Sequence, residues 1–394
     1  MKDDTKMVHS GRDPQKNFGI VNPPIYHAST ILYPTLDAFK NRAKGDAKYR
    51  KARYGAYGTP TTYALADTVA DLEGGRGGVV TSSGLAAVTF AVTAFVKKGD
   101  HILMVDSAYG PTRNFCDTVL KGFGIETTYY DPLIGERIGD LIRANTRVVF
   151  TESPGSLTFE VQDIPAISAQ AHKKDVVVLM DNTWGTPLFF KPFEHGVDVS
   201  IQAGTKYIAG HSDLVIGIIT ARTESLFRKV KDATMAFGDI AGPDDCYQTL
   251  RGLRSMGVRL RHQQAAGLKI AQWMKKRPEI KRVMYPPLPD DPGHAVWKRD
   301  FTGACSLFGV VLNTSTEKAV SRMLDNYRLF KIGASWGGFE SLVIPVDPAK
   351  AREAVPWTEK GYVLRYHIGL EDTDDLIADL KDGFDRLNQA LGQG

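Results

Sequence analysis

The sequence predicts an α/β protein with a mostly parallel, doubly wound β-sheet. Between residues 74 and 220, short apolar runs of strand length alternate with helical stretches, the order expected for such a sheet. The runs are almost continuously apolar, as in strands that are covered on both faces. At 394 residues, the chain is long enough for roughly two or three domains and a large core.

The elements follow in order along the chain. Residues 1–58 predict an irregular N-terminal arm, because they are rich in Pro, Tyr and basic side chains. Residues 59–252 predict the sheet-containing domain. "GLAAVTFAVTAFVKKGD" (84–100) predicts a helix that ends in lysines and a glycine. The predicted strands are 77–82, 100–106, 146–153, 175–182, 198–202 and 213–220.

Residues 253–394 predict a smaller α+β C-terminal domain. A long helical stretch over 249–276 leads into it, and a proline-rich loop follows at 285–294. The last predicted helix, 372–391, carries acidic residues in its first turn. Its apolar stripe consists of Leu376, Ile377, Leu380, Phe384 and Leu387.

Composition excludes several classes of protein. The 49 basic and 45 acidic residues give a net charge of only +4, so neither nucleic acid nor an anionic membrane is expected as a partner. The N-terminus has no apolar segment typical of a secretory signal, and the apolar run 85–96 is too short to span a bilayer. Cys116, Cys246 and Cys305 are widely separated, which predicts reduced thiols in a cytoplasmic protein without a disulfide framework or metal site.

Two ionisable residues follow predicted strands. Asp181 ends the run "VVVLMD", and Lys206 comes just after "VDVSIQ". Ligands of α/β sheets bind at the carboxyl ends of the strands. An acid and a base there suit a pyridoxal phosphate site, in which a lysine forms a Schiff base and a carboxylate keeps the pyridine nitrogen protonated. These two residues alone are equally compatible with a turn-capping aspartate and a solvated lysine.

A phosphate group could bind near the start of a helix. The turn Ser82-Ser83-Gly84 runs into a predicted helix, whose free N–H groups can face an anion, and the hydroxyl of Thr205 could reach the same group. Such turns are also common as purely structural features. The turn fits neither GxGxxG nor GxxxxGK[ST], which counts against a nicotinamide or nucleoside triphosphate site.

Two further residues are candidates for ligand contacts. Tyr109, in "VDSAYGPT", follows a strand and could stack on a cofactor ring or belong to the core. Arg365, in "YVLRYHIGLED", shares one face of a predicted strand with His367. An arginine in an apolar strand needs a carboxylate, which could be the α-carboxylate of a substrate or the partner in an internal ion pair.

Longer motifs identify a family. They include "DLEGG", "GDHILMVDSAYGP", "FTESPGS", "DNTWGTPLFFKP", "DVSIQAGTKYIAGHSD", "RGLRSMGVRLR", "SWGGFES" and "HIGLEDTDDLIADL". In this order they closely resemble the Cys/Met-metabolism enzymes that depend on pyridoxal phosphate, the fold-type I group of cystathionine lyases and synthases. Within that group the chain is most similar to the bacterial β-lyases, because "ESPGS" and "SWGG" resemble their sequences more than those of γ-acting relatives.

The resemblance implies a fold-type I, aminotransferase-like architecture and a set of cofactor contacts. Lys206 would be the Schiff-base lysine and would transfer protons, Asp181 would bind the pyridine nitrogen, and Tyr109 would stack on the ring. The phosphate would be bound by the backbone N–H groups of Gly84 and Leu85 and the hydroxyl of Thr205.

The resemblance also implies substrate contacts and an assembly. Arg365 and Ser335 would bind the substrate carboxylate, and Trp336 would line the pocket. Tyr54 in the arm would reach the phosphate and substrate of a neighbouring subunit, in a homotetramer built as a dimer of dimers. The implied reaction is α,β-elimination of L-cystathionine to homocysteine, pyruvate and ammonia. A broader C–S lyase, a cysteine desulfhydrase or an amino acid racemase, with Tyr109 opposite Lys206, are the alternatives.

The chain departs from its family at three positions. Ala56 stands where many relatives carry an arginine that clamps the phosphate, and Arg53 or Tyr57 could replace that arginine. Ala203 stands where many relatives have serine, and Ala334 where β-lyases often have tyrosine. The last change predicts a wider substrate pocket. A related protein that has lost turnover is disfavoured, because Lys206, Asp181, Tyr109 and Arg365 are all retained.

Overall fold

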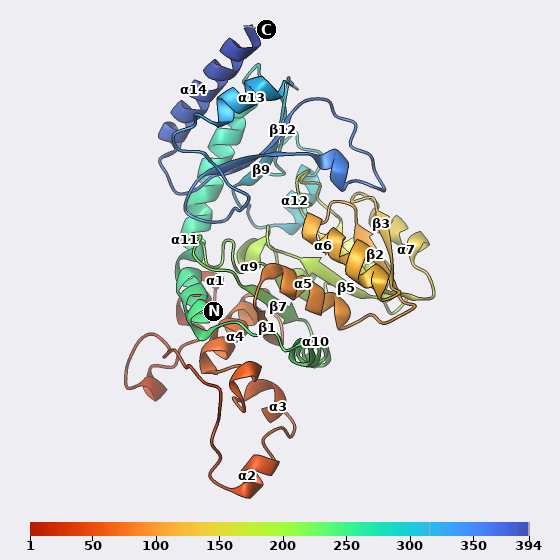
Figure 1. Ribbon diagram of the computed structural model, residues 1–394, viewed down its shortest axis with the longest axis vertical. Coiled ribbons are helices and arrows are strands. Elements are labelled where there is room, and N and C mark those ends of the chain that lie inside the picture. Colours follow the sequence, from red (N-terminus) through yellow and green to blue (C-terminus); the bar gives the residue numbers. More distant parts are fainter. Residues whose placement is uncertain (315, 393–394) are drawn as a thin grey trace.

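A computed structural model describes residues 1–314 and 316–392. The chain forms an arm at one end, a large sheet with its helices in the middle, and a second sheet with the C-terminal helix at the other end (Figure 1).

The large sheet has seven strands in the order β1-β7-β6-β5-β4-β2-β3. Neighbouring strands from β6 to β3 are parallel, whereas β7 runs antiparallel to both β6 and β1. The mostly parallel α/β prediction is therefore confirmed. The strands are β1 (Gly77–Thr81), β2 (His101–Val105), β3 (Glu126–Tyr130), β4 (Thr146–Glu152), β5 (Val177–Asp181), β6 (Val199–Gln202) and β7 (Gly217–Ala221).

Strand β3 has no counterpart among the predicted strands. It lies at the sheet edge and pairs only with β2, and its first residue, Glu126, is exposed. Its sequence, "ETTYY", lacks the continuous apolar character of strands that are covered on both faces. All five residues of the adjacent β2 are buried, which is why that strand was recognisable.

The second sheet has five strands in the order β10-β11-β12-β9-β8. Its pairs are antiparallel except for β10 and β11. The strands are β8 (Ile280–Met284), β9 (Leu307–Leu312), β10 (Lys331–Ile332), β11 (Leu342–Val346) and β12 (Val363–His367). This mixed region agrees with the smaller α+β part that the sequence predicts.

Helices surround both sheets. They are α1 (Asp3–His9), α2 (Leu36–Lys40), α3 (Ala47–Arg50), α4 (Pro60–Glu73), α5 (Gly84–Thr93), α6 (Gly110–Asn114), α7 (Ile138–Leu141), α8 (Ile164–His172), α9 (Thr186–Phe189), α10 (Glu224–Phe237), α11 (Pro243–Met274), α12 (His294–Asp300), α13 (Glu317–Leu324) and α14 (Thr373–Gly392). Helix α11 packs against α4 of the large sheet region and against α14 (Figure 1). The boundary at residues 252–253 lies within this continuous helix.

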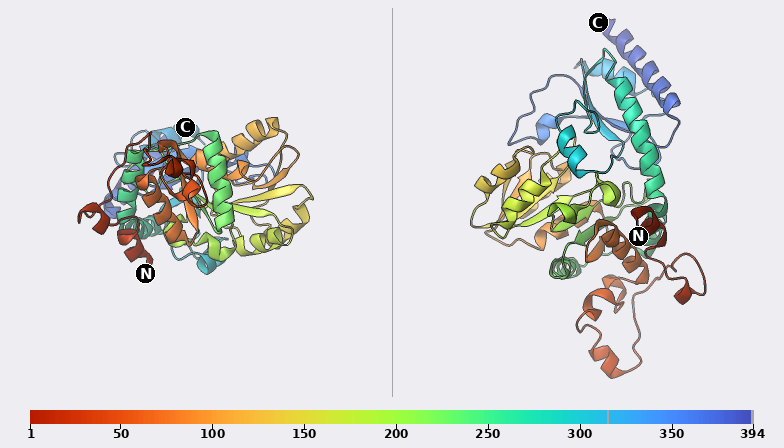
Figure 2. Two further views of the ribbon diagram at one scale, coloured as in Figure 1. Left: turned by 90° about the horizontal axis from the view of Figure 1, so that it is seen from below. Right: turned by 180° about the vertical axis from the view of Figure 1, so that it is seen from behind.

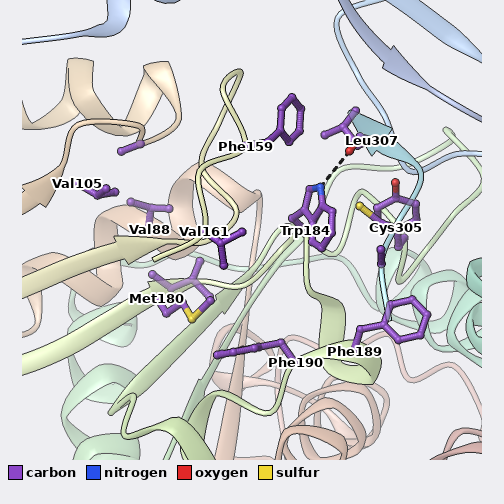
Figure 3. Packing of buried hydrophobic residues seen from close by; sticks show 14 of the residues in the cluster. Val88, Val105, Phe159, Val161, Met180, Trp184, Phe189, Phe190, Cys305 and Leu307 are labelled. Carbon is purple, nitrogen blue, oxygen red and sulfur yellow. Dashed lines mark hydrogen bonds between the residues drawn. The ribbon is translucent and has the colours of Figure 1, made fainter. Parts of the chain in front are cut away.

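The apolar core continues from one sheet region into the other. Trp184, at the carboxyl edge of the large sheet, donates from Nε1 to the carbonyl oxygen of Leu307 on β9 at 3.1 Å. Phe159 lies beside this pair (Figure 3). This hydrogen bond and the packing around the Trp184 indole therefore connect the second sheet to the large sheet.

The arm begins with α1, which packs against α4 and α11. Its later part extends away from the sheets and lies below them in the rear view of Figure 2. It exposes large apolar side chains, with Phe18 98% and Leu32 88% exposed. Among the helices over 1–314 and 316–392, none combines the length and the apolar character that a bilayer crossing requires.

Candidate active site

A cavity of about 380 Å³ lies where the carboxyl edge of the large sheet meets the second sheet region. The sequence-predicted residues that line it are Lys206, Asp181, Tyr109, Gly84, Leu85, Thr205, Arg365, Ser335 and Trp336. Tyr54 does not line it; its side chain belongs to the arm and is exposed. The fold thus brings together residues that are up to 281 positions apart in the sequence, from Gly84 to Arg365.

Lys206 lies in the turn that follows β6. Its backbone N–H donates to the Ala203 carbonyl at 3.0 Å, and its Nζ donates to Ser335 Oγ at 2.8 Å. Burial lowers the pKa of Lys206 to about 8, and the nearby charge of Arg365 acts in the same direction. A lysine with this pKa can serve as a nucleophile and base near neutral pH.

The turn that carries Trp336 approaches the Lys206 backbone closely. Gly337 has φ +84°, and a Cβ at this residue would lie 2.9 Å from the Cα of Lys206 and 2.8 Å from the nitrogen of Tyr207. Only glycine satisfies both the backbone angle and the contact. The "SWGG" motif therefore supports the position of Lys206.

Asp181 is the last residue of β5. Its Oδ1 accepts hydrogen bonds from the Thr183 N–H at 3.0 Å and from the Thr183 hydroxyl at 2.6 Å. Both bonds go to one oxygen; Oδ2 accepts no hydrogen bond from residues 1–314 and 316–392 and is available to a ligand. Burial raises the pKa of Asp181, while the bonds from Thr183 oppose that rise.

The start of α5 forms a cradle beside Ala203. Ser83 caps this helix, since its Oγ accepts from the Ala86 N–H at 3.0 Å. The first N–H groups of a helix have no intrahelical partner, so those of Gly84 and Leu85 can bind an anion. A Cβ on Gly84 would lie 2.8 Å from the Cβ of Ala203 and would fill this space.

The hydroxyl of Thr205 already has partners within the chain. It donates to the Ile216 carbonyl at 3.1 Å and accepts from the Ile216 N–H at 2.9 Å. A hydroxyl has a single proton, so donation to a phosphate would require this one to turn away from Ile216. Thr205 must therefore give up a hydrogen bond to contact the phosphate, whereas the N–H groups of Gly84 and Leu85 need not.

Arg365 projects from β12 into the cavity. Its Nη2 donates to the carbonyls of Ala334 and Ser335 at 3.2 and 3.1 Å. Over the described ranges, no carboxylate lies within salt-bridge distance of this guanidinium, so an internal ion pair does not account for it. Burial lowers the pKa of Arg365 to about 10, so the group stays charged at neutral pH and can bind a carboxylate.

Glu152 also lines the cavity and was not among the predicted residues. It is the last residue of β4 and pairs in register with Asp181 on β5. Its Oε2 accepts from the backbone N–H of Tyr109 at 2.8 Å. The signal that pointed to Asp181, an acid at the end of an apolar strand, was equally present in "TRVVFTES".

The arm near Ala56 contains a stacked arginine. The guanidinium carbon of Arg53 lies 3.7 Å from the centroid of the Tyr57 ring, and Lys231 Nζ donates to the Tyr57 carbonyl at 3.1 Å. Arg53 Nη2 also donates to Met235 Sδ on α10 at 3.4 Å, so Arg53 contacts both Tyr57 and α10 within its own chain.

A segment of the second sheet region holds the loops around the cavity. The carboxylate of Asp106 accepts from the backbone N–H groups of Glu353 and Val355, each at 2.9 Å. Arg352 forms an ion pair with Glu160, in the loop that follows β4. These contacts connect the loop of Tyr109 and the loop after β4 to the part of the chain that carries Arg365.

The start of α5 can bind an anion, Lys206 has a lowered pKa, and Arg365 has no carboxylate partner within the described residues. These features suit a cofactor-dependent enzyme that acts on amino acids. Comparison with known proteins gives the family. Residues 4–385 match the family described as Cys/Met metabolism PLP-dependent enzyme, and the chain belongs to it. The family and cofactor predictions are therefore confirmed.

Several relatives match over nearly their full length. A putative cystathionine beta-lyase of Rhizobium johnstonii is 48% identical, with 96% of this chain and 95% of the relative covered. A cystathionine beta-lyase of Haemophilus influenzae is 43% identical, with 97% and 98% covered. An L-alanine/L-glutamate racemase of Wolbachia pipientis is 40% identical, with 98% of each chain covered. The crystal structure of metB from Corynebacterium glutamicum matches with a TM-score of 0.90 and 30% identity, covering 98% of both chains.

The residues present fit pyridoxal phosphate. The free Oδ2 of Asp181 suits a protonated ring nitrogen, and the space that a Cβ on Gly84 would fill suits a phosphate near two free N–H groups.

Proposed function

We propose that this protein is a pyridoxal-phosphate-dependent C–S β-lyase that cleaves L-cystathionine to homocysteine, pyruvate and ammonia by α,β-elimination. The observation that carries the proposal is the position of Lys206, whose amine of lowered pKa lies in one cavity with Arg365 and Asp181. The names of the Rhizobium and Haemophilus relatives support the choice of substrate.

The cofactor contacts follow from the cavity. Lys206 would hold the cofactor covalently through Nζ, Asp181 would bind the ring nitrogen, and Tyr109 would cover one face of the ring. The N–H groups of Gly84 and Leu85 would bind the phosphate. When bound, pyridoxal phosphate withdraws electrons from the α-carbon of an amino acid and so makes the Cα proton removable.

Lys206 would perform both proton transfers of the elimination. With a pKa of about 8, about one amine in ten is neutral at pH 7, against about one in three thousand for a lysine of pKa 10.5. Once the amino group of the substrate has replaced Lys206 on the cofactor, the freed Lys206 amine would take the Cα proton. It would then give a proton to the sulfur as the Cβ–S bond breaks. Proton transfer by a positioned group contributes typically about 10²–10⁴-fold to the rate. Ser335 Oγ, 2.8 Å from Nζ, orients the amine.

Arg365 would fix the substrate by its α-carboxylate. Two of its carbonyl contacts already hold the guanidinium in place, which reduces the entropy lost on binding. Leu157, Phe159 and Trp336 supply apolar surface in the same cavity, which suits the thioether of the substrate. Water completes the reaction by converting the three-carbon fragment to pyruvate and ammonia.

Pyruvate release from L-cystathionine tests the proposal. The purified protein should produce pyruvate and homocysteine in equal amounts, and Lys206→Ala should reduce the rate below detection. Lys174→Ala, whose amine contacts the Gly139 carbonyl away from the cavity, should keep the wild-type rate. Pyruvate production by Lys206→Ala at the wild-type rate would refute the role of Lys206.

We also propose that the protein acts as a homotetramer, a dimer of dimers, in the cytoplasm. The exposed Phe18 and Leu32 of the arm need a cover, and Tyr54 lies outside the cavity of its own chain, as expected if it serves a neighbour. Cys116, Cys246 and Cys305 are free and buried, which suits a reducing compartment. Sedimentation should give about four times the monomer mass; a fully active monomer would contradict this assembly.

Amino acid racemisation is a second candidate. The Wolbachia relative is a racemase by name, and Tyr109 shares the cavity with Lys206, so two proton-exchanging groups are present. Release of D-alanine from L-alanine, measured beside pyruvate from cystathionine and from cysteine, distinguishes racemase, β-lyase and desulfhydrase.

A further inference from the structure

Glu152 and Asp181 are neighbours at the carboxyl edge of the large sheet. The two residues are register partners at the ends of the parallel strands β4 and β5, and both line the cavity. Their contacts differ. Asp181 is bonded by Thr183 through Oδ1, whereas Glu152 Oε2 accepts the backbone N–H of Tyr109 at 2.8 Å.

Glu152 thus reaches across from β4 to the loop after β2. That loop turns sharply, since the Ala108 N–H donates to the Val105 carbonyl, and the Tyr109 carbonyl then accepts from the Arg113 N–H at the start of α6. The Tyr109 N–H points the other way, to Glu152. Tyr109 lines the cavity and is 47% exposed, so packing against neighbouring side chains does little to fix its ring.

We propose that Glu152 is a positioning residue for Tyr109: its carboxyl group holds the Tyr109 backbone and thereby sets the tilt of the ring over the cofactor site. This inference rests on the proposed function, in which Tyr109 covers the cofactor ring. The interaction needs an acceptor oxygen at this point and no negative charge.

The charge state of Glu152 agrees with such a role. Burial and the neighbouring Asp181 raise the pKa of Glu152, which favours the neutral form. A neutral Glu152 still offers a carbonyl oxygen to Tyr109. The hydrogen bonds from Thr183 and the charge of Lys206 oppose the rise in the pKa of Asp181, so the charged form is better stabilised at Asp181 than at Glu152.

Two variants separate the acceptor from the charge. Glu152→Gln keeps an acceptor oxygen and removes the ionisable proton, whereas Glu152→Ala removes the acceptor. Asp100→Ala is the matched control: Asp100 Oδ2 accepts the Lys97 N–H at 2.9 Å at the opposite, amino end of β2. It removes the same kind of bond far from the cavity.

Hydrogen exchange of the Tyr109 amide gives a readout that requires neither cofactor nor turnover. We expect exchange to accelerate at least about tenfold in Glu152→Ala and to stay near wild type in Glu152→Gln and Asp100→Ala, since protection follows the opening of the hydrogen bond. Unchanged protection in Glu152→Ala would overturn the inference even if the wild-type protein proved to be no lyase.

The effect of Glu152 on the position of the Tyr109 ring is measured in the holoenzyme. In Glu152→Ala, the visible circular dichroism of the bound cofactor should fall by about half or more, and kcat by about 10- to 100-fold, as for a misplacement of about 1 Å. KM and cofactor content should change by less than about threefold. In the background of Tyr109→Ala, removing Glu152 should leave the dichroism unchanged, because the two residues act as a unit.

Two results would contradict the role of Glu152 in positioning the Tyr109 ring. Wild-type dichroism and kcat in Glu152→Ala would show that the contact does not position the ring. Equal damage in Glu152→Gln and Glu152→Ala would assign the effect to the ionisable proton instead of the acceptor. A wild-type protein that holds no cofactor would refute the proposed function, and the amide exchange would still decide the contact.

Discussion

Substitution of Gly337 by alanine tests how the "SWGG" turn supports the catalytic lysine. A Cβ here would lie 2.8–2.9 Å from backbone atoms of Lys206 and Tyr207, and the residue has φ +84°. An ordinary contact for such a Cβ is 3.4 Å or more, so the two segments must separate by about half an ångström or more. The left-handed backbone adds roughly 1–2 kcal/mol of unfavourable free energy.

The separation should affect catalysis more than folding. Lys206 Nζ and Ser335 Oγ lie 2.8 Å apart and are carried by the two segments that are forced apart. A displacement approaching 1 Å at a catalytic group costs about 100-fold in kcat, which corresponds to about 2.7 kcal/mol of activation free energy. We therefore expect Gly337→Ala to fold and to lose about two orders of magnitude in kcat.

Gly99→Ala is the matched control for this experiment. Gly99 has nearly the same φ, +88°, but a Cβ there would meet nothing within 4 Å. Gly99→Ala should lose roughly 1–2 kcal/mol in the free energy of unfolding, measured with urea. Gly337→Ala should lose about 1–3 kcal/mol more, because its Cβ also forces the two segments apart, and only Gly337→Ala should lose pyruvate release. Equal kcat in the two variants would refute the claim that this contact places Lys206.

Three other predictions concern the substrate, the ring nitrogen and the lysine. Arg365→Ala should raise KM for cystathionine by about 10²-fold or more with a smaller change in kcat, because hydrogen bonds to charged groups are worth about 1.5–3 kcal/mol each; an unchanged KM excludes its carboxylate role. Asp181→Asn keeps an acceptor for Thr183, so it should still bind cofactor while kcat falls by about 10²-fold or more; near-normal turnover would count against its charge. The cofactor-free protein should bind pyridoxal phosphate with a rate that rises about tenfold per pH unit below pH 8 and levels off above it, since only the neutral amine reacts and the pKa of Lys206 is lowered to about 8. A plateau reached only near pH 10.5 would contradict the lowered pKa.

The pattern of apolar residues predicted most strands of the large sheet. Strands β2, β4 and β5 are covered on both faces, so their runs are continuous and recognisable. The edge strand β3 is only partly buried and contains polar residues, so its sequence gives no continuous apolar run that would predict a strand. Helix α11 crosses the expected domain boundary, because its sequence is helical on both sides of residue 252 and nothing local marks where one region ends.

Site residues were predictable where a charged side chain stands in or directly after an apolar strand, a position in which charged residues are rare. An acid or lysine after an apolar strand, and an arginine within one, pointed to Asp181, Lys206 and Arg365. The partners that decide each group's chemistry come from elsewhere in the chain: Ser335 lies 129 residues from Lys206, and Glu152 lies 43 residues from Tyr109. Such pairs depend on the folded sheet and leave no local pattern.

The covalent attachment of the cofactor to Lys206 is the central claim, and one measurement tests it directly. The holoenzyme is treated with sodium borohydride, digested, and mapped by mass spectrometry. The account predicts a pyridoxyl adduct on the peptide that contains Lys206 and on no other lysine at comparable yield. An unmodified Lys206 in a protein that carries stoichiometric cofactor would contradict it.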